Sequence, residues 1–229
     1  MGAAPKVVAL LPAYNLEDVV GGVVERTRAF VDEVVVAADG SRDGTAAAAR
    51  AAGAHVPEPE AVRGKAFAII KGVRACRDLE PDVVVILDAD GQHLPEEIPA
   101  VAAPVLAGEA DVVNGSRMLG TLRTSRLMKW GNLALKIVSF ALTWRWITDT
   151  ETGFRAFRAE KLFALELRSR GYEIESELIL KSMHRGYVIR EVPITVPFAV
   201  PGVTAADGLQ VAWYKVRTVL RLKLGREPA

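Results

Sequence analysis

Two aspartates separated by one residue follow a strongly apolar run. Asp88 and Asp90 come directly after residues 82–87 (DVVVIL), and Gly91 and Gln92 follow them. Carboxylates are hard oxygen ligands of the kind that Mg²⁺ and Mn²⁺ prefer, and a pair of them leaves coordination sites open for diphosphate oxygens. Residues two apart in an extended segment point the same way, so both aspartates and Gln92 could face one ion. The pattern indicates a metal and diphosphate site; an isolated D-x-D is more often a surface turn.

Polar residues also follow two earlier apolar runs. Residues 12–15 (PAYN) come after the run 6–11, and residues 39–44 (DGSRDG) come after the run 33–38. Ligands of open α/β sheets bind outside the carboxyl ends of the strands, so Asp39 could contact a nucleotide, whereas Asp43 suits a turn. Neither G-x-G-x-x-G nor a P-loop is present to cradle phosphate.

Lys65 and His93 are two further candidates for contact with a ligand near these motifs. Lys65 stands where a helix is expected to begin after a loop, and it either contacts a phosphate or is solvated. His93 could be a ligand, but a polar loop histidine is the plainer interpretation.

The elements that must position these residues alternate in type. Apolar runs predict strands at 6–11, 33–38, 54–56 and 82–87, and helical spacing predicts helices at 15–30 (capped by Asn15), 44–53 and 65–78. This alternation predicts an α/β fold with a doubly wound, mostly parallel sheet flanked by helices up to about residue 115.

The pattern changes beyond residue 120. We expect a long amphipathic helix at 123–144, an irregular segment at 148–158, and a helix at 175–186 closed by glycine. The run 187–196 contains Pro193, which favours an edge strand, and residues 207–226 form a basic amphipathic helix.

Composition limits the remaining choices. The 229 residues suit one domain, and a net charge of +1 gives no reason to expect a nucleic-acid partner. The single cysteine, Cys76, permits no internal disulfide and fits a reducing compartment as a core residue. The first residues lack the pattern of a signal peptide, and no run of about 18 uncharged apolar residues exists. We expect a cytoplasmic protein, or a peripheral one on the cytoplasmic face of the membrane.

Taken together, the motifs resemble the family-2 glycosyltransferases, and most closely the polyprenyl-phosphate hexose synthases such as dolichyl-phosphate mannose synthase. The resemblance runs in order from residue 5 to about residue 196. It is carried by PAYN (12–15), ADGSRDGT (38–45), RGKA (63–66), LDADGQH (87–93), NGSR (114–117), GN (131–132), DTETGFRAF (149–157) and 171–194.

The resemblance implies a single GT-A domain, a divalent metal and inversion at the anomeric carbon. It assigns residues up to about 115 to a nucleotide-sugar (GDP-mannose or UDP-glucose type) and residues 116–200 to the acceptor, a polyprenyl phosphate. The resemblance implies that the donor is bound by Pro12, Ala13, Tyr14, Asn15, Asp39, Asp88 and Ala89. It implies that the metal is held by Asp88, Asp90 and Gln92. The resemblance implies that the acceptor is bound by Arg117, Ser125, Arg126, Asn132 and Arg155, and that Asp149 and Arg155 lie beneath the reacting centre. It implies a catalytic set of Asp90, Asp149, Arg117 and Arg126.

Two positions depart from the family pattern. Ala38 stands where relatives usually carry aspartate, and Leu16 stands where they often carry glutamate, a residue that Glu17 could replace. Both positions lie on the nucleoside side, so uracil and guanine both stay open as the base.

The acceptor leaves three readings open. A phosphate is already anionic and needs arginines rather than a strong base, whereas a soluble or protein-bound hydroxyl needs a carboxylate base, for which Asp149 or Glu151 is the candidate. The third reading, an idle nucleotide-sugar-binding paralogue or regulatory subunit, conflicts with the intact D-x-D motif. A lipid acceptor requires access to a membrane surface or a membrane-anchoring partner. Either the helix 123–144 or the C-terminal helix, which carries Trp213 and Tyr214, could lie at the membrane surface. The alternative is that these helices pack on the fold or in a dimer interface.

Overall fold

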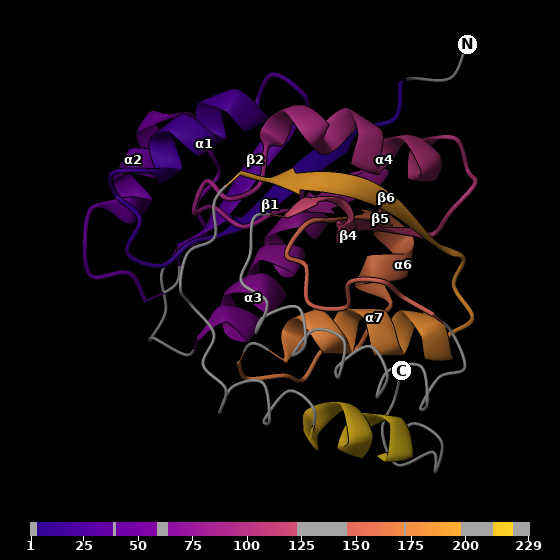
Figure 1. The fold of residues 1–229 in the computed structure, drawn as a ribbon. Coiled ribbons are helices and arrows are strands. Elements are labelled where there is room, and N and C mark those ends of the chain that lie inside the picture. The colour runs from indigo at the N-terminus through magenta and orange to yellow at the C-terminus, as the bar shows by residue number, and fades with distance from the viewer. Residues whose placement is uncertain are drawn as a thin grey trace.

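One mixed sheet forms the centre of the molecule (Figure 1). The computed structural model describes residues 4–38, 40–58, 64–122, 146–171, 173–197 and 213–221. Within them the strands are β1 (Val7–Pro12), β2 (Glu33–Ala37), β3 (Val83–Ile86), β4 (Val112–Leu122), β5 (Arg155–Arg158) and β6 (Ile189–Val196). Their order across the sheet is β2-β1-β3-β5-β4-β6.

Helices cover both faces of this sheet (Figure 1). One face packs against α1 (Val20–Thr27), α2 (Thr45–Ala51) and α4 (Ile98–Leu106), which follows the short 3₁₀ helix η1 (Pro95–Glu97). The other face packs against α3 (Lys65–Arg77), α6 (Ala159–Phe163) and α7 (Ile174–His184). Alternate residues of β1 enter the two cores, since Ala9 and Leu11 belong to the first and Val8 and Leu10 to the second. Burial on both faces explains why the strand is apolar throughout.

The pairing of the strands sets where the polar loops meet. β1 is parallel to both β2 and β3, so the residues after these three strands lie at one edge of the sheet. β5 runs antiparallel between β3 and β4, and its first residue, Arg155, pairs with Ile86 at the end of β3 and with Asn114 of β4. The segment before β5 therefore reaches the same edge as Asp88.

Most predicted elements of the first half are confirmed, and three predictions are wrong. The run 54–56 forms only a single bridge, between His55 and Val35, and the segment 148–158, expected to be irregular, contains the internal strand β5. The helix predicted from Asn15 begins at Val20 instead. Asn15 has a φ of 52°, which asparagine tolerates better than most residues, and its Oδ1 accepts a hydrogen bond from the backbone of Arg42.

The second half agrees with the sequence where it is described. α7 ends near Gly186 (φ 73°), and β6 lies at the end of the strand order and contains Pro193, as expected for an edge strand. The helix predicted at 123–144 lies outside the described residues; of the C-terminal helix, residues 213–221 are described and are helical. No helix in the described part of the chain has the length and apolarity needed to cross a membrane.

Candidate functional site

The two loops predicted to contact the donor's nucleoside are held together by hydrogen bonds. The backbone N–H of Asn15 donates to Ser41 Oγ (3.1 Å), and the backbone N–H of Gly44 donates to Glu17 Oε2 (2.6 Å). One carboxylate oxygen of Glu17 thus fixes the second loop. Tyr14 is 53% exposed between them, so its ring is available to a ligand. Asp39 lies outside the described residues.

The strand end next to these loops is closed by backbone contacts. Pro12 is the last residue of β1, and Ala13 is buried and donates its N–H to the carbonyl of Ala37 (3.1 Å). Asp43 accepts from both the N–H (3.1 Å) and the hydroxyl (2.5 Å) of Thr45, and that hydroxyl lowers the pKa of Asp43. Asp43 therefore caps the turn into α2, in agreement with the plainer of its two interpretations.

Asp88, the first carboxylate after β3, is paired with a lysine. Its Oδ1 lies 2.7 Å from Lys65 Nζ at the first residue of α3, and the same ammonium lies 3.0 Å from Glu175 Oε1 on α7. Burial is the largest single influence and would raise the pKa of Asp88, but Lys65, His93 and Arg117 together outweigh it and lower the pKa. Burial would likewise lower the pKa of Lys65, and the two carboxylates raise it instead. Both groups are therefore charged at neutral pH.

Asp90 lies in a turn, not in the extended segment that the sequence analysis assumed. Its Oδ1 accepts from the backbone N–H of Gln92 (3.0 Å), and its Oδ2 accepts from Gln92 Nε2 (2.5 Å). Gly91 between them has a φ of 80°, a conformation that residues with a Cβ seldom adopt. The turn therefore brings the side chains of Asp90 and Gln92 together, rather than the alternation of side chains along an extended strand.

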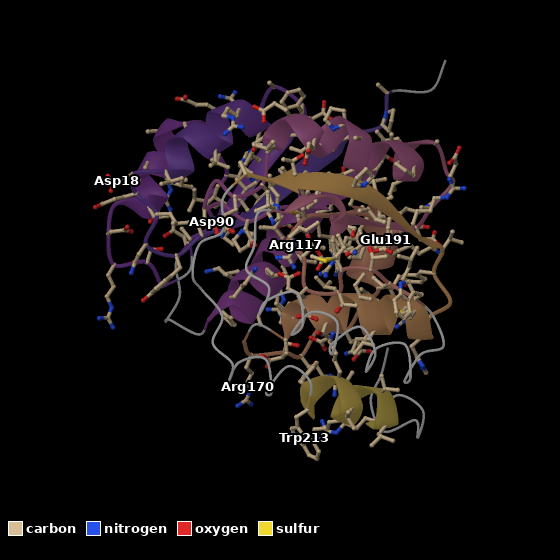
Figure 2. The ribbon with its side chains drawn as sticks, in the orientation of Figure 1. Asp18, Asp90, Arg117, Arg170, Glu191 and Trp213 are labelled. Atoms are coloured by element: carbon tan, nitrogen blue, oxygen red, sulfur yellow. The ribbon has the colours of Figure 1, made fainter. Side chains whose placement is uncertain are left out.

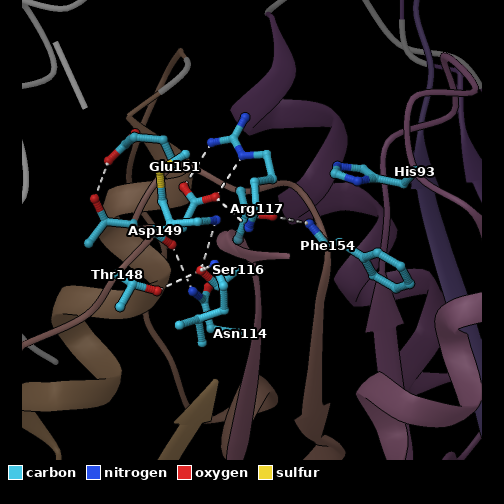
Figure 3. Close-up of polar contacts among 12 residues, drawn as sticks. His93, Asn114, Ser116, Arg117, Thr148, Asp149, Glu151 and Phe154 are labelled. Atoms are coloured by element: carbon cyan, nitrogen blue, oxygen red, sulfur yellow. Dashed lines mark hydrogen bonds and ion pairs between the residues drawn. The ribbon is translucent and has the colours of Figure 1, made fainter. Parts of the chain in front are cut away.

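His93 differs from its expected place in a polar loop. Its ring is buried against Phe154, with centroids 5.4 Å apart, and its Nε2 lies 3.8 Å from Asp88 Oδ2. Burial is the main cause that lowers the pKa of His93, so the ring is neutral at neutral pH. Figure 3 shows the His93 ring beside Arg117. The signal for burial was missing from the sequence because Phe154 is 61 positions away.

Gly153 approaches Asp88 so closely that any residue with a Cβ would displace the Asp88 carboxylate. A Cβ at this position would lie 2.2 Å from Asp88 Oδ2 and 2.6 Å from its Cγ. The glycine of the DTETGF motif therefore leaves space for the donor-side carboxylate.

Replacing Gly153 with alanine should displace the Asp88 carboxylate from Lys65 and leave the fold intact, because only the end of a side chain has to move. Loss of a charged hydrogen bond is worth about 1.5–3 kcal/mol, so the Kd for the nucleotide-sugar should rise roughly 10- to 150-fold in calorimetric titrations. Gly22→Ala is the matched control, since a Cβ there meets nothing within 4 Å. Unchanged donor affinity in Gly153→Ala would contradict this role.

The part of the site predicted to bind the acceptor is built around an ion pair between Arg117 on β4 and Asp149 (Figure 3). Arg117 Nε and Nη2 donate to the two carboxylate oxygens of Asp149 at 2.6 and 2.8 Å, and the backbone N–H of Arg117 donates to Oδ2 at 3.1 Å. Asp149 is buried, yet Arg117 outweighs burial and lowers the pKa of Asp149. A buried carboxylate held in this way is a poor general base.

The backbone of this segment is fixed by further polar side chains. Asn114 Nδ2 donates to the carbonyl of Asp149 (2.7 Å), and the Thr148 N–H donates to the carboxylate of Glu191 on β6 (2.9 and 3.0 Å). Ser116 and Thr148 share a hydrogen bond of 2.5 Å. The predicted motifs 114–117 and 149–157 are therefore brought together, as the resemblance implied.

Arg155 is placed differently from its expected role. It is 1% exposed, and its three guanidinium nitrogens donate to Asn114 Oδ1 (2.8 Å), Glu175 Oε2 (2.6 Å) and the carbonyl of Thr150 (2.8 Å). Each nitrogen of this buried guanidinium therefore already donates to an acceptor within the protein. The geometry favours a positioning role over the direct acceptor contact that the motif implied. Ser125, Arg126 and Asn132 lie outside the described residues.

The residues after β3 have the chemistry of a divalent metal site. Asp88, Asp90 and Gln92 supply carboxylate and amide oxygens, which suit Mg²⁺ or Mn²⁺. In the described part of the chain no three His, Cys, Asp or Glu side chains are grouped closely enough to hold an ion by themselves. An ion here would take its other ligands from diphosphate oxygens and water, as Mg²⁺ commonly does, so the residues fit such an ion.

Several residues of the site were not assigned by sequence reasoning. Glu175, Glu191 and Lys215 all contact the acceptor-side segment or its neighbours. For Glu175 a signal was available, because it lies between the core residues Ile174 and Leu178. The helical pattern predicts that this position is buried, and a charged residue there is unusual. Glu191 and Lys215 gave no such signal, because their partners are distant in sequence.

The chain is similar in sequence to proteins of a known family. Residues 9–163 match Glycosyl transferase family 2. An undecaprenyl-phosphate mannosyltransferase from Micrococcus luteus is 32% identical over 83% of each chain. A UDP-N-acetylglucosamine–dolichyl-phosphate N-acetylglucosaminyltransferase from Methanococcus voltae is 27% identical and covers 95% of this chain and 96% of its own.

The fold also has close structural relatives. Glucosyl-3-phosphoglycerate synthase from Mycobacterium tuberculosis, solved with Mn²⁺, UDP-glucose and phosphoglyceric acid, superposes with a TM-score of 0.74 at 23% identity over 99% of this chain and 82% of its own. The arrangement of the sheet is that of the GT-A fold. With its strand-end carboxylates and its family match over two-thirds of the sequence, the chain belongs to the family-2 glycosyltransferases.

Proposed function

We propose that this chain transfers a hexose, mannose or glucose, from a nucleotide-sugar to a polyprenyl or dolichyl phosphate, with inversion at the anomeric carbon. One observation carries the proposal: one short segment joins the carboxylate expected to hold the donor to the arginine expected to hold the acceptor. Asp149 pairs with Arg117, and four residues later Gly153 packs against the carboxylate of Asp88. A donor diphosphate and an acceptor phosphate would meet between Asp88 and Arg117. The two relatives described above, one named for a UDP-sugar and both for a polyprenyl-type phosphate, support these substrates.

On the donor side, Asp88, Asp90 and Gln92 would hold Mg²⁺ or Mn²⁺, and the bound ion would neutralise charge on the departing nucleoside diphosphate. Lys65 keeps Asp88 ionised and in place. The nucleoside would lie against Pro12, Ala13, Tyr14, Asn15, Asp39 and Ala89, with Glu17 holding the loop behind it. Mn²⁺ and UDP-glucose in the mycobacterial synthase support this kind of donor.

On the acceptor side, Arg117 would bind the lipid phosphate together with Ser125, Arg126 and Asn132. Asp149 fixes the plane of the Arg117 guanidinium and leaves Nη1 without a described partner. A phosphate oxygen carries its charge already, so it attacks the anomeric carbon without giving up a proton. The nucleoside diphosphate leaves from the opposite face, which inverts the configuration. No general base is required, in agreement with the locked state of Asp149.

A hydroxyl acceptor is the second candidate, and it would need a base other than Asp149. Glu151 is the remaining carboxylate of the segment and is 20% exposed at its side chain. An idle paralogue is the third candidate, and the presence of Asp88, Asp90 and Gln92 argues against it.

Access to a lipid acceptor would come from the C-terminal helix. In residues 213–221 the exposed positions 213, 217, 220 and 221 lie on one face and combine Trp213 (69% exposed) and Leu220 with two arginines. Figure 2 shows Trp213 and Arg170 at the same lower border of the molecule. We propose that this face touches the cytoplasmic surface of a membrane, since aromatic and basic side chains suit the headgroup region.

The acceptor is tested by comparing two lipids. Purified protein with Mn²⁺ and the matching nucleotide-sugar should transfer sugar to a short-chain polyprenyl phosphate in detergent and not to the corresponding polyprenol. Product can be followed by thin-layer chromatography of labelled sugar, and its anomeric configuration by NMR. Transfer to the alcohol at an equal rate would overturn the phosphate acceptor and favour the hydroxyl mechanism through Glu151.

A further inference from the structure

A charged residue of the C-terminal helix reaches into the catalytic region. Lys215 is fully buried, and its Nζ lies 2.8 Å from Glu151 Oε1 and 2.7 Å from Thr150 Oγ1. The helix that carries it, residues 213–221, lies beside α7 in Figure 1, on the outer side of that layer. An ammonium group is costly to bury unless it is paired, so this contact is a specific feature of the packing.

The partner of Lys215 collects donors from several parts of the chain. Glu151 Oε1 accepts from Ser176 Oγ on α7 (2.7 Å) and from the Thr150 hydroxyl (3.0 Å), in addition to Lys215. Lys215 is the only one of these donors that carries a charge. The ammonium therefore provides the strongest of the described contacts that hold this carboxylate.

Glu151 lies in the middle of the segment that connects the two halves of the site. Two residues before it, Asp149 orients Arg117, and two residues after it, Gly153 packs against Asp88. The other described hydrogen bonds that hold this segment come from residues of β4, β5, β6 and α7, which belong to the central sheet and its helices. Lys215 adds a contact from the C-terminal helix.

We propose that Lys215 is a positioning residue for sugar transfer, which acts through Glu151 to hold residues 149–153 in the geometry that aims Arg117 at the acceptor. The inference rests on the proposed function. It makes the C-terminal helix a part of the catalytic unit as well as a candidate membrane contact. Because Lys65, itself paired with Glu175, holds Asp88 from α3, the effect falls mainly on the transfer step rather than on donor binding.

The test is Lys215→Met, which keeps the length of the side chain and removes its charge. A misplacement of about 1 Å in an active site can cost roughly 10²-fold in rate, so kcat for transfer to polyprenyl phosphate should fall by about that factor. The Kd for the nucleotide-sugar, measured by calorimetry, should stay close to that of the wild type. Lys161→Met is the matched control, because Lys161 pairs with Glu160 on the surface of α6, and its kcat should not change.

A double-mutant cycle separates positioning from simple packing of the helix. If Lys215 acts through Glu151, Lys215→Met should cause little further loss of kcat in the Glu151→Gln background. An equal loss in both backgrounds would show that Lys215 only packs the helix and would overturn the proposal. The double variant buries no unpaired charge, so it keeps the test valid if Lys215→Met alone does not fold.

The proposed function and the role of Lys215 can be refuted separately. A wild-type chain that binds the donor but transfers nothing to polyprenyl phosphate would refute the proposed function. A wild-type chain that transfers sugar, with Lys215→Met equally fast, would refute only the role of Lys215. A fall in donor affinity that matches the fall in kcat would also contradict it.

Discussion

Replacing Asp90 with alanine should reduce kcat/KM for sugar transfer by about 10³-fold or more and leave the protein folded. The stabilisation that a divalent ion gives to developing charge is worth several kcal/mol, and about 4 kcal/mol corresponds to roughly 10³-fold in rate. Asp90 is partly buried in a surface turn, and its described partner is Gln92, so its removal costs little stability. Initial rates of nucleoside diphosphate release measure the effect.

The matched control for this variant is Asp78→Ala. Asp78 is exposed at the end of α3, a helix of 13 residues that spans about 20 Å from Lys65 at its start. Its activity should equal that of the wild type. An active Asp90→Ala enzyme would refute the metal assignment, and an inactive wild type would favour an idle paralogue.

Arg117→Ala should have the second large effect, on both activity and stability. Loss of a charged contact to the acceptor phosphate removes about 1.5–3 kcal/mol, so kcat/KM for polyprenyl phosphate should fall roughly 10- to 150-fold. The same change leaves Asp149 buried without its counter-ion, and breaking a buried pair in this way costs about 3–5 kcal/mol of stability. Urea unfolding and steady-state kinetics measure the two losses.

The double variant Arg117→Gln/Asp149→Asn separates these two effects. It removes both buried charges, so most of the lost stability should return, while activity towards the lipid phosphate should stay low. Donor affinity should remain near that of the wild type, because Lys65 still pairs with Asp88. Full transfer activity in a stable double variant would show that Arg117 does not bind the acceptor.

Local pattern was sufficient for the elements that carry the donor motifs. The runs before residues 12, 38 and 88 are apolar because their strands are buried on both faces, and this is visible in the sequence without any partner. The position of Asp88 at the edge of the sheet followed directly. The backbone path after it did not, because Gly91 turns the chain and makes Asp90 and Gln92 converge.

Contacts between distant segments were the part that the sequence did not reveal. β5 is a short strand whose pairing with β3 and β4 is antiparallel and non-local, so its residues read as irregular. His93 is buried because Phe154 covers it, and Lys215 is buried because Glu151 neutralises it. In each case a polar residue of ordinary surface type is made internal by a partner more than 60 positions away.

The donor site itself is tested most directly by the thermal stability of the protein with nucleotide-sugars and metal. A ligand at 100 times its Kd stabilises the native state by about 2.7 kcal/mol, which raises Tm by roughly 5–11 °C for a chain of this size. We predict such a shift for one UDP- or GDP-sugar with Mn²⁺ or Mg²⁺, its loss on adding EDTA, and its absence in Asp90→Ala. A shift of equal size without metal, or in Asp90→Ala, would contradict the assignment of Asp88 and Asp90 to a metal-bound diphosphate.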